Sequence, residues 1–307
     1  MTSAHETTLI LGGSWHGQYG TAPCPVCQPE RRNNQNALTL ANGDDGKLLL
    51  HCKKAQCSFT DILAASGVAQ GSYDKPDLAA TARRASEAKE AAAQKVRQAL
   101  RCWEESRSIK GSFAGYYLRE IRGIACRLPE TLRFNPSCWH GPTGRRYPAL
   151  VASVCGGDAF AVHRTYLRPG GTGKAGLAGG DKLMLGRTRG GAVRLTDGAG
   201  PLVIGEGIES TLSAFLLHGV PTARAWAALS TSGLRGLRLP TASPSGLAET
   251  HGPSLILAID GDAAGRAAGR DLAQRATGLG WHVGIMDPGD GIDWNDRLMM
   301  EVRRENA

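Results

Sequence analysis

The sequence predicts a chain of several domains that combines α+β with α/β structure. Three observations support this prediction: two close pairs of cysteines near the N-terminus, a long polar segment of helix-forming residues, and strands alternating with helices after residue 200. A length of 307 residues accommodates two or three such domains. The hydrophobic share of 41% is enough for real cores and excludes a chain that is disordered as a whole.

The N-terminal cysteines predict a zinc site. Cys24 and Cys27 are separated by two residues, Cys52 and Cys57 by four, and two short strand-like pieces lie between the pairs. Tetrahedral zinc takes four such ligands from turns on adjacent hairpins. We therefore predict a small zinc-binding domain over residues 10–68.

The remaining cysteines lack such spacing, and we interpret them as small buried apolar side chains. They are Cys102, Cys126, Cys138 and Cys155. His51, next to Cys52, is an alternative zinc ligand.

Aromatic and basic side chains are interleaved in the same segment. They are Trp15, His16, Tyr19 and Phe59 among Arg31, Arg32, Lys47, Lys53 and Lys54. Aromatic rings stack on bases and cations hold the backbone of single-stranded nucleic acid. The alternative is that the aromatic residues fill a small core. Lys53 and Lys54 are the candidate nucleic-acid contacts.

A linker and a long polar helix are predicted over residues 69–110. Residues 69–77 are polar and contain glycine and proline, whereas residues 78–105 are rich in Ala, Arg, Lys, Glu and Gln. We expect one exposed helix that spaces the first domain from the rest.

Residues 111–200 are predicted to form a basic α+β lobe, with a helix at 113–121. The formal charge of +8 divides into +3 for residues 1–110, +8 for this segment and −3 for the remainder. A basic surface attracts polyanions such as nucleic acid; the alternative is an unevenly charged solvated surface. The expected strands are 149–154, 159–166 and 182–185.

Residues 201–307 predict an α/β domain. Short apolar strands alternate with helices, which is typical of a parallel sheet covered on both faces. The expected strands are 202–204, 223–228, 254–259 and 282–286, the expected helices are 210–218 and 263–278, and a Ser/Pro/Gly loop is expected at 241–253.

Carboxylates follow two of these strands. Glu206 comes just after the first strand, and Asp260 and Asp262 come just after the apolar strand 254–259. Ligands of open parallel sheets bind outside the carboxyl ends of the strands, and Mg²⁺ prefers carboxylate oxygens. We therefore expect these three residues to bind metal or to take part in catalysis.

A third acidic group lies near the C-terminus, at Asp290, Asp293 and Asp296. It is interpreted either as an addition to the metal site or as a helix cap with a solvated turn.

These motifs resemble a known family. Glu206-Gly followed by Asp260-Gly-Asp262 resembles the Toprim domain of topoisomerases, primases and some nucleases, and the cysteine quartet resembles the zinc ribbon that precedes it in bacterial-type DNA primases. Residues 293–296 are similar to a motif of phage- and plasmid-encoded relatives, so a compact form from a mobile element is expected. Segments 117–124, 147–150, 161–166 and 181–186 resemble the primase core.

The sequence departs from the family at three points. Ser210 stands where replicative primases place an acid four residues after the glutamate, which leaves open whether Glu209 replaces it. Cys27 stands in place of the usual zinc histidine. The sequence ends soon after the Toprim segment, without the helical region that docks on the replicative helicase.

The resemblance implies synthesis of short RNA primers on single-stranded DNA from ribonucleoside triphosphates. Asp260 and Asp262 would hold Mg²⁺ or Mn²⁺, with Asp293 or Asp296 assisting, and Glu206 would be a further ligand or a general base. His163, Arg164, Lys174 and Lys182 are the candidate contacts to template or triphosphate. Two alternatives are a Toprim nuclease and a non-catalytic adaptor that binds single-stranded DNA.

Further expectations concern partners and location. A separate replicative helicase is an expected partner. No apolar run approaches 18 residues, so no membrane span is expected. We expect a cytoplasmic protein of a bacterial or phage-infected cell.

Overall fold

The computed structural model describes most of the chain. The described residues are 3–30, 36–43, 46–67, 78–240 and 253–305. The predicted linker 69–77, nearly all of the loop 241–253, and Arg31 and Arg32 lie outside them. Contacts divide the chain into two compact units, Met1–Ala91 and Ala92–Ala307.

The first unit is a four-stranded antiparallel sheet with two helices, α1 (Ala4–Ile10) and α2 (Phe59–Ser66). Helix α1 was not predicted; it begins with a capping box in which Ser3 and Glu6 each accept the other's backbone N–H. In sheet order the strands are β1 (Ser14–Trp15), β2 (Tyr19–Ala22), β3 (Leu38–Asn42) and β4 (Leu48–Cys52).

The core of this unit is small. Leu38 and Leu40, alternate residues of β3, pack with Ile62 and Leu63 of α2, and the buried thiols of the cysteine pairs adjoin them. With so little apolar area to bury, the unit needs a further source of stability, such as a metal.

Helix α3 (Leu78–Glu104) is a single helix of 27 residues, as predicted. The described side chains before its last turns are mostly exposed. Near its end, Ala99 and Cys102 are buried against the sheet of the basic lobe. The end of the helix is therefore anchored in the second unit.

The basic lobe is a five-stranded antiparallel sheet. The predicted helix at 113–121 is a short helix, α4 (Phe113–Tyr116), continued by one π-helical turn, Tyr117–Ile121. Strand β6 was not predicted, because Pro136 and a bulge between Asn135 and Cys138 break the alternation of its side chains. In order, the strands are β5 (Arg107–Ser108), β6 (Leu132–His140), β7 (Arg145–Val154), β8 (Ala161–Tyr166) and β9 (Lys182–Leu185).

The C-terminal sheet has the strand order β10-β12-β11-β13-β14. All its strands run parallel except β10 (Val193–Thr196), which pairs antiparallel with β12 although it lies before the predicted boundary at residue 200. The other strands are β11 (Leu202–Gly205), β12 (Arg224–Ala227), β13 (Ser254–Ala258) and β14 (His282–Met286).

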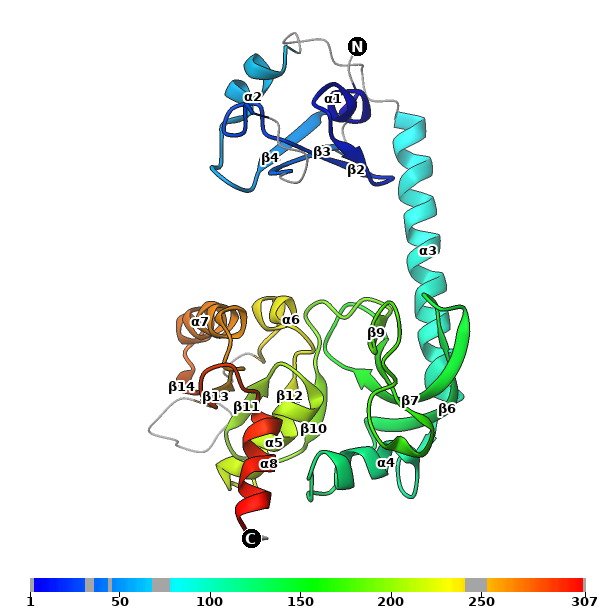
Figure 1. Ribbon diagram of the computed structural model, residues 1–307, viewed down its shortest axis with the longest axis vertical. Coiled ribbons are helices and arrows are strands. Elements are labelled where there is room, and N and C mark those ends of the chain that lie inside the picture. The colour runs from blue at the N-terminus through cyan, green and yellow to red at the C-terminus, as the bar shows by residue number, and fades with distance from the viewer. Residues whose placement is uncertain (1–2, 31–35, 44–45, 68–77, 241–252, 306–307) are drawn as a thin grey trace. The chain divides into compact units, whose positions relative to one another are not determined.

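Helices cover both faces of this sheet (Figure 1). Ile204 and Leu257 face α6 and α7, whereas their neighbours Val203 and Ala258 pack with α5 and α8. This alternation is what a parallel sheet buried on both faces requires. The helices are α5 (Ile208–His218), α6 (Thr231–Gly236), α7 (Ala263–Gly278) and α8 (Trp294–Glu305).

One hydrophobic core joins the basic lobe to the α/β domain. Leu118 and Leu150 of the lobe belong to the same buried cluster as Ile208, Leu212 and Leu298 of the domain. This shared core fixes the position of the basic lobe, and so of its candidate residues, relative to the α/β domain.

Trp294 attaches α8 to the end of β13, since its indole N–H donates to the Ile259 carbonyl over 2.8 Å. We expect Trp294→Phe to cost about 1–2 kcal/mol more stability than Trp281→Phe in thermal or urea unfolding. Trp281 is also buried, but its indole N–H has no partner among the described residues. Because the two variants lose similar volume, equal destabilisation would contradict the assigned hydrogen bond.

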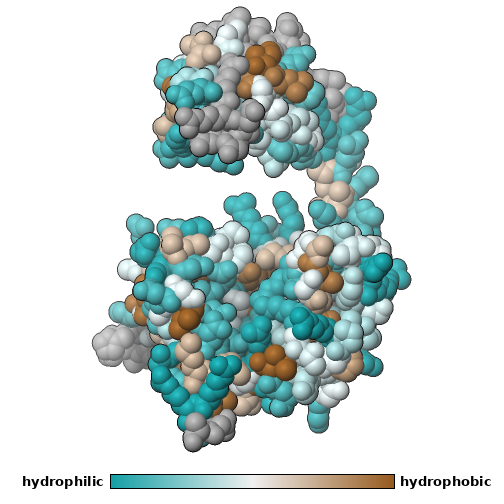
Figure 2. Space-filling model, viewed as in Figure 1, coloured by the Kyte–Doolittle hydropathy of each residue, from teal (hydrophilic) through white to brown (hydrophobic). Residues whose placement is uncertain are grey.

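Within the described residues, no helix is long and apolar enough to cross a membrane. On the face of the second unit drawn in Figure 2, hydrophilic side chains predominate and the hydrophobic ones are scattered.

Candidate functional site

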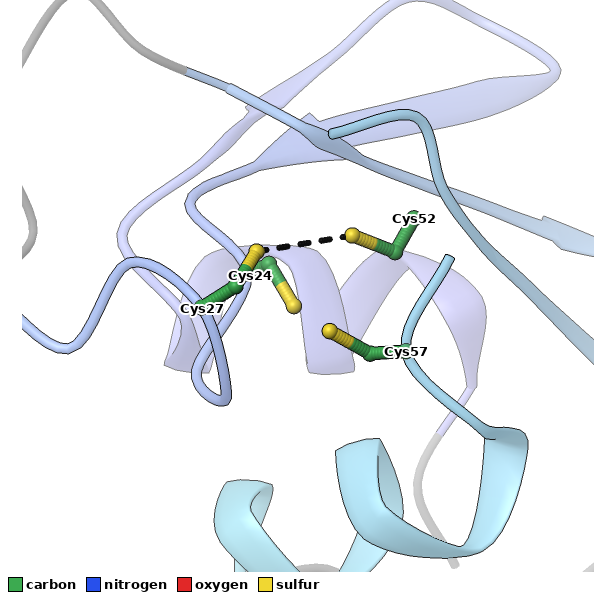
Figure 3. A group of neighbouring side chains, drawn as sticks. All are labelled: Cys24, Cys27, Cys52 and Cys57. Carbon is green, nitrogen blue, oxygen red and sulfur yellow. Dashed lines mark hydrogen bonds between the residues drawn. The ribbon is translucent and has the colours of Figure 1, made fainter. Parts of the chain in front are cut away.

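The four predicted zinc ligands come together in the first unit (Figure 3). The Sγ atoms of Cys24, Cys27, Cys52 and Cys57 all lie within 4.8 Å of one another, and those of Cys27 and Cys52 are 3.5 Å apart. Four sulfurs around a zinc ion are about 3.8 Å apart at ordinary zinc–sulfur distances. The cluster therefore has the donor set and size that zinc requires. His51 is exposed and is not part of it.

Backbone geometry shapes both cysteine turns. The Gln28 side-chain oxygen accepts the backbone N–H groups of Cys24 and Ala37, over 3.1 and 3.0 Å, and so closes the first turn. Gln56 has a φ of +48°, and this left-handed residue directs the chain back toward Cys57.

The environment of Cys52 favours a thiolate. Burial alone would raise the pKa of this thiol, but hydrogen bonds from the backbone of Ala55, Cys57 and Lys54 lower its pKa to about 6. Thiolate is the form that ligates metal.

The structure separates the aromatic side chains of this unit into two kinds. Trp15 is half-buried against the core, whereas Tyr19 and Phe59 are 44% and 42% exposed. Lys53 and Lys54 are exposed as well. The interpretation of all the aromatic residues as core is therefore wrong for Tyr19 and Phe59, which are accessible for stacking.

In the second unit, the acidic residues lie at the carboxyl ends of neighbouring strands. Glu206 directly follows β11 and Asp260 lies two residues after β13; these two strands are paired in parallel. Both side chains are half-buried. Burial raises the pKa of Glu206, and the negative charge of Asp262 raises it further.

Asp260 has the features of a metal ligand. Its buried Oδ1 atom has no hydrogen-bond partner among the described residues. Burial and the charges of Glu206, Asp293 and Asp262 raise the pKa of its carboxyl group to about 7, and a hydrogen bond from Ser210 offsets part of this shift. A cation would relieve both the missing bond and the repulsion, so these residues fit a hard divalent ion.

The other acidic residues also cap helices. The Asp262 carboxylate accepts the Gly265 N–H at the start of α7 over 2.6 Å, and Asp262 is otherwise exposed. Asp293 accepts the N–H groups of Asn295 and Asp296 at the start of α8, each over 2.8 Å. Asp293 therefore caps α8, as one of the two interpretations expected. Its negative charge also raises the pKa of Asp260.

The carboxylates are less tightly gathered than the thiols. Within the part of the chain that the structure describes, only the four cysteines gather as a group of three or more side chains placed to hold a metal ion.

Two lysines of the basic lobe meet the α/β domain at Glu209. Lys182 Nζ lies 3.0 Å from Glu209 Oε2, and Lys174 Nζ lies 4.0 Å from Oε1. The Tyr117 hydroxyl donates to Oε1 over 3.0 Å. Burial alone would raise the pKa of Glu209, but the two ammonium groups hold it far below its usual range.

The neighbouring candidates His163 and Arg164 face opposite sides of β8. His163 is buried on the side of the lysines, its Nδ1 lacks a partner among the described residues, and burial followed by the charge of Lys182 lowers its pKa to about 4. Arg164 points to the α3 side, where its guanidinium donates to the carbonyls of Trp139 and Met184. Side chains alternate along a strand, so Arg164 lies on the side of β8 opposite to the lysines. This differs from the expectation that all four residues contact the same ligand.

Sequence reasoning missed a buried polar network behind Glu209. Arg122 donates to the Tyr117 hydroxyl over 2.9 Å and to Asn295 Oδ1 over 3.0 Å. Asn295 in turn donates to Ser213 Oγ on α5. The available signal was the presence of Tyr117 and Arg122 in segment 117–124 and of Asn295 in segment 293–296.

Comparisons with known families match two parts of the chain. Residues 201–303 match the Toprim domain, and residues 93–195 match a domain of unknown function (DUF7146). No curated protein matches the sequence.

Three solved structures show similarity at low identity. The zinc-binding and RNA polymerase domains of the Aquifex aeolicus primase match at 15% identity and a TM-score of 0.41, covering 99% of this chain and 85% of that one. The RNA polymerase domain of the Mycobacterium tuberculosis primase matches at 15% and 0.36, covering 69% and 82%. The primase fragment of the bacteriophage T7 primase-helicase protein matches at 14% and 0.34, covering 92% and 97%.

The sheet order, the carboxylates at the ends of β11 and β13, and the match over 103 residues agree with one another. Residues 201–303 of this chain belong to the Toprim domain family.

Proposed function

We propose that this chain is a DNA primase that synthesises short RNA primers on single-stranded DNA by metal-dependent nucleotidyl transfer. One observation carries the proposal: Lys174 and Lys182 of the lobe pair with Glu209 of the Toprim domain, the charge of Lys182 also acts on Glu206, and one continuous core holds the two parts together. Phosphoryl chemistry needs both, because cations bind the triphosphate and carboxylates hold the metal.

Each side of the site has a role in this proposal. Asp260, Asp262 and Glu206, with Asp293 and Asp296 beside them, would hold Mg²⁺ or Mn²⁺, which when bound would neutralise phosphate charge and lower the pKa of the attacking 3′ hydroxyl. Glu206 is a ligand or the general base that accepts the hydroxyl proton.

Lys174 and Lys182 would contact the triphosphate or the template strand, and His163 would lie buried beside them without a contact of its own. Lys174 and Lys182 remain 33% and 38% exposed, so an anion can reach them. We assign Arg164 no phosphate contact, because it is buried on the other side of the sheet.

The first unit would hold zinc through Cys24, Cys27, Cys52 and Cys57 and would grip the template. Exposed Tyr19 and Phe59 offer surfaces for base stacking, and Lys53 and Lys54 supply cations for the backbone. We further propose a division into a zinc ribbon (10–68), a linker with a long helix (69–110), a basic lobe (111–200) and a catalytic domain (201–307).

The proposal is tested by incubating the chain with single-stranded DNA, labelled ribonucleotides and Mg²⁺ or Mn²⁺. We expect new short labelled RNA that depends on template and metal. Shortened template without new RNA would identify a nuclease instead, and a gel shift without either product would identify an adaptor.

We also propose the setting in which such a primase acts. It would work in the cytoplasm of a bacterial or phage-infected cell, in the replication of a mobile element, with a separate replicative helicase as partner. Stimulation of primer synthesis by that helicase would test the partnership.

A further inference from the structure

Glu209 is buried and both of its carboxylate oxygens are occupied. Oε1 accepts the Tyr117 hydroxyl over 3.0 Å and lies 4.0 Å from Lys174 Nζ. Oε2 lies 3.0 Å from Lys182 Nζ. With a side chain only 6% exposed, Glu209 has its negative charge fully matched by the two ammonium groups.

Asp260 has the opposite surroundings. Its charged neighbours are carboxylates, those of Glu206, Asp262 and Asp293, and its Oδ1 lacks a hydrogen-bond partner among the described residues. A divalent cation is attracted to such a place, whereas two ammonium groups repel it from Glu209. Asp260 therefore has acidic neighbours that a cation would neutralise, whereas Glu209 already has two cations beside it.

We infer that Glu209 is a positioning residue and not a metal ligand: it holds Lys174 and Lys182 where they meet the phosphates of an incoming nucleotide. The identity of the anion as a nucleotide rests on the proposed function; the pairing of Glu209 with the lysines does not.

A lysine benefits from such an anchor because its four-carbon stem is flexible. Ordering it costs about 2 kcal/mol of rotamer entropy, which an existing ion pair offsets before the ligand arrives. Two ammonium groups on one carboxylate leave one positive charge in excess, and both lysines keep about a third of their surface exposed. The anchor is itself fixed, since Arg122 binds Tyr117 and Asn295 of α8 binds Arg122.

The inference is tested with Glu209→Gln, which keeps the size of the side chain and removes its charge. Mn²⁺ binding, measured by calorimetry, is expected to change less than twofold in Glu209→Gln and to be lost in Asp260→Asn. ATP binding without divalent cation is expected to weaken about tenfold in Glu209→Gln, as for loss of one charge-assisted contact. Loss of Mn²⁺ binding in Glu209→Gln, or unchanged or tighter ATP binding, would overturn the inference.

A double-variant cycle separates positioning from general damage. Lys182→Met is expected to weaken ATP binding about tenfold. If Glu209 acts through Lys182, the double variant should lose at most a further twofold. Losses that multiply would show that Glu209 acts independently of Lys182.

A milder variant covers the case in which Glu209→Gln does not fold. Tyr117→Phe removes only the hydroxyl that fixes Oε1, and we expect ATP binding to weaken about threefold. Normal ATP affinity in a folded Tyr117→Phe protein, verified by thermal melting, would contradict the anchoring role. Because ATP and Mn²⁺ binding are measured without turnover, a wild-type chain that makes no primer would overturn the proposed function and leave this test standing.

Discussion

Asp260→Asn is expected to abolish primer synthesis and at the same time to stabilise the metal-free protein. The substitution removes the carboxylate whose Oδ1 is buried without a partner, so metal ligation is lost, while the repulsion from Glu206, Asp262 and Asp293 also disappears. Primer synthesis on single-stranded DNA measures the first effect, and thermal melting in EDTA measures the second.

The pH dependence of this gain follows from the sign of the pKa shift. The pKa of Asp260 is raised from its ordinary 3.8 to about 7, so the ionised carboxylate costs stability in the folded state. The cost is absent below about pH 4, grows as the pH rises toward 7 and is complete above it. After allowance for solvent screening, we expect Asp260→Asn to raise the free energy of unfolding by about 2 kcal/mol at pH 8, or the Tm by roughly 5 °C. This difference from the wild-type chain should vanish near pH 4.

Divalent cation provides the control for this prediction. Mg²⁺ should raise the Tm of the wild-type chain, because a ligand that binds only the folded state stabilises it, and should leave Asp260→Asn unchanged. An Asp260→Asn protein that still makes primers would overturn the catalytic assignment.

Removal of zinc is expected to unfold the first unit and leave the second folded. The core of the first unit holds few large apolar residues, and two of the four cysteines are fully buried within it. Structural zinc contributes on the order of 10 kcal/mol to such small folds. We expect one zinc per chain by elemental analysis, and a strong chelator should make the first unit sensitive to protease while residues 92–307 resist.

Cys57→Ser should reproduce the effect of the chelator, since it removes one of the four ligands. Cys155→Ser is the matched control, because Cys155 is a half-buried cysteine of the second unit outside the cluster. A Cys57→Ser protein with full zinc content and an intact first unit would contradict the assigned ligand set.

Local signals predicted those elements that carry their own pattern. β11 and most of β13 are apolar runs, and the structure places β11, β13 and β14 within one residue of the predictions. The cysteine cluster was predicted because paired spacing reflects a coordination sphere. β6 was missed because a bulge interrupts its alternation.

The relation of Lys182 to Glu209 lay beyond the sequence for a different reason. Lys182 begins β9 of the lobe, whereas Glu209 lies in the first turn of α5, and the two adjoin only because the lobe and the α/β domain share one core. Likewise, the strand position of Arg164 decides which side it faces, and a shift of one residue would have reversed it. Contacts that depend on the docking of whole domains produce no periodic pattern in the sequence.

The shared core and the edge strand β10 also determine how this chain can be divided. A fragment beginning at residue 201 would match the family boundary but would lose β10, leaving the outer edge of β12 open to pairing with other molecules. It would also expose Ile208 and Leu212, which the lobe covers. We expect such a fragment to aggregate, whereas a fragment that begins at residue 92 should stay in solution. The segment that matches the domain family is therefore shorter than the part of the chain that folds as one unit.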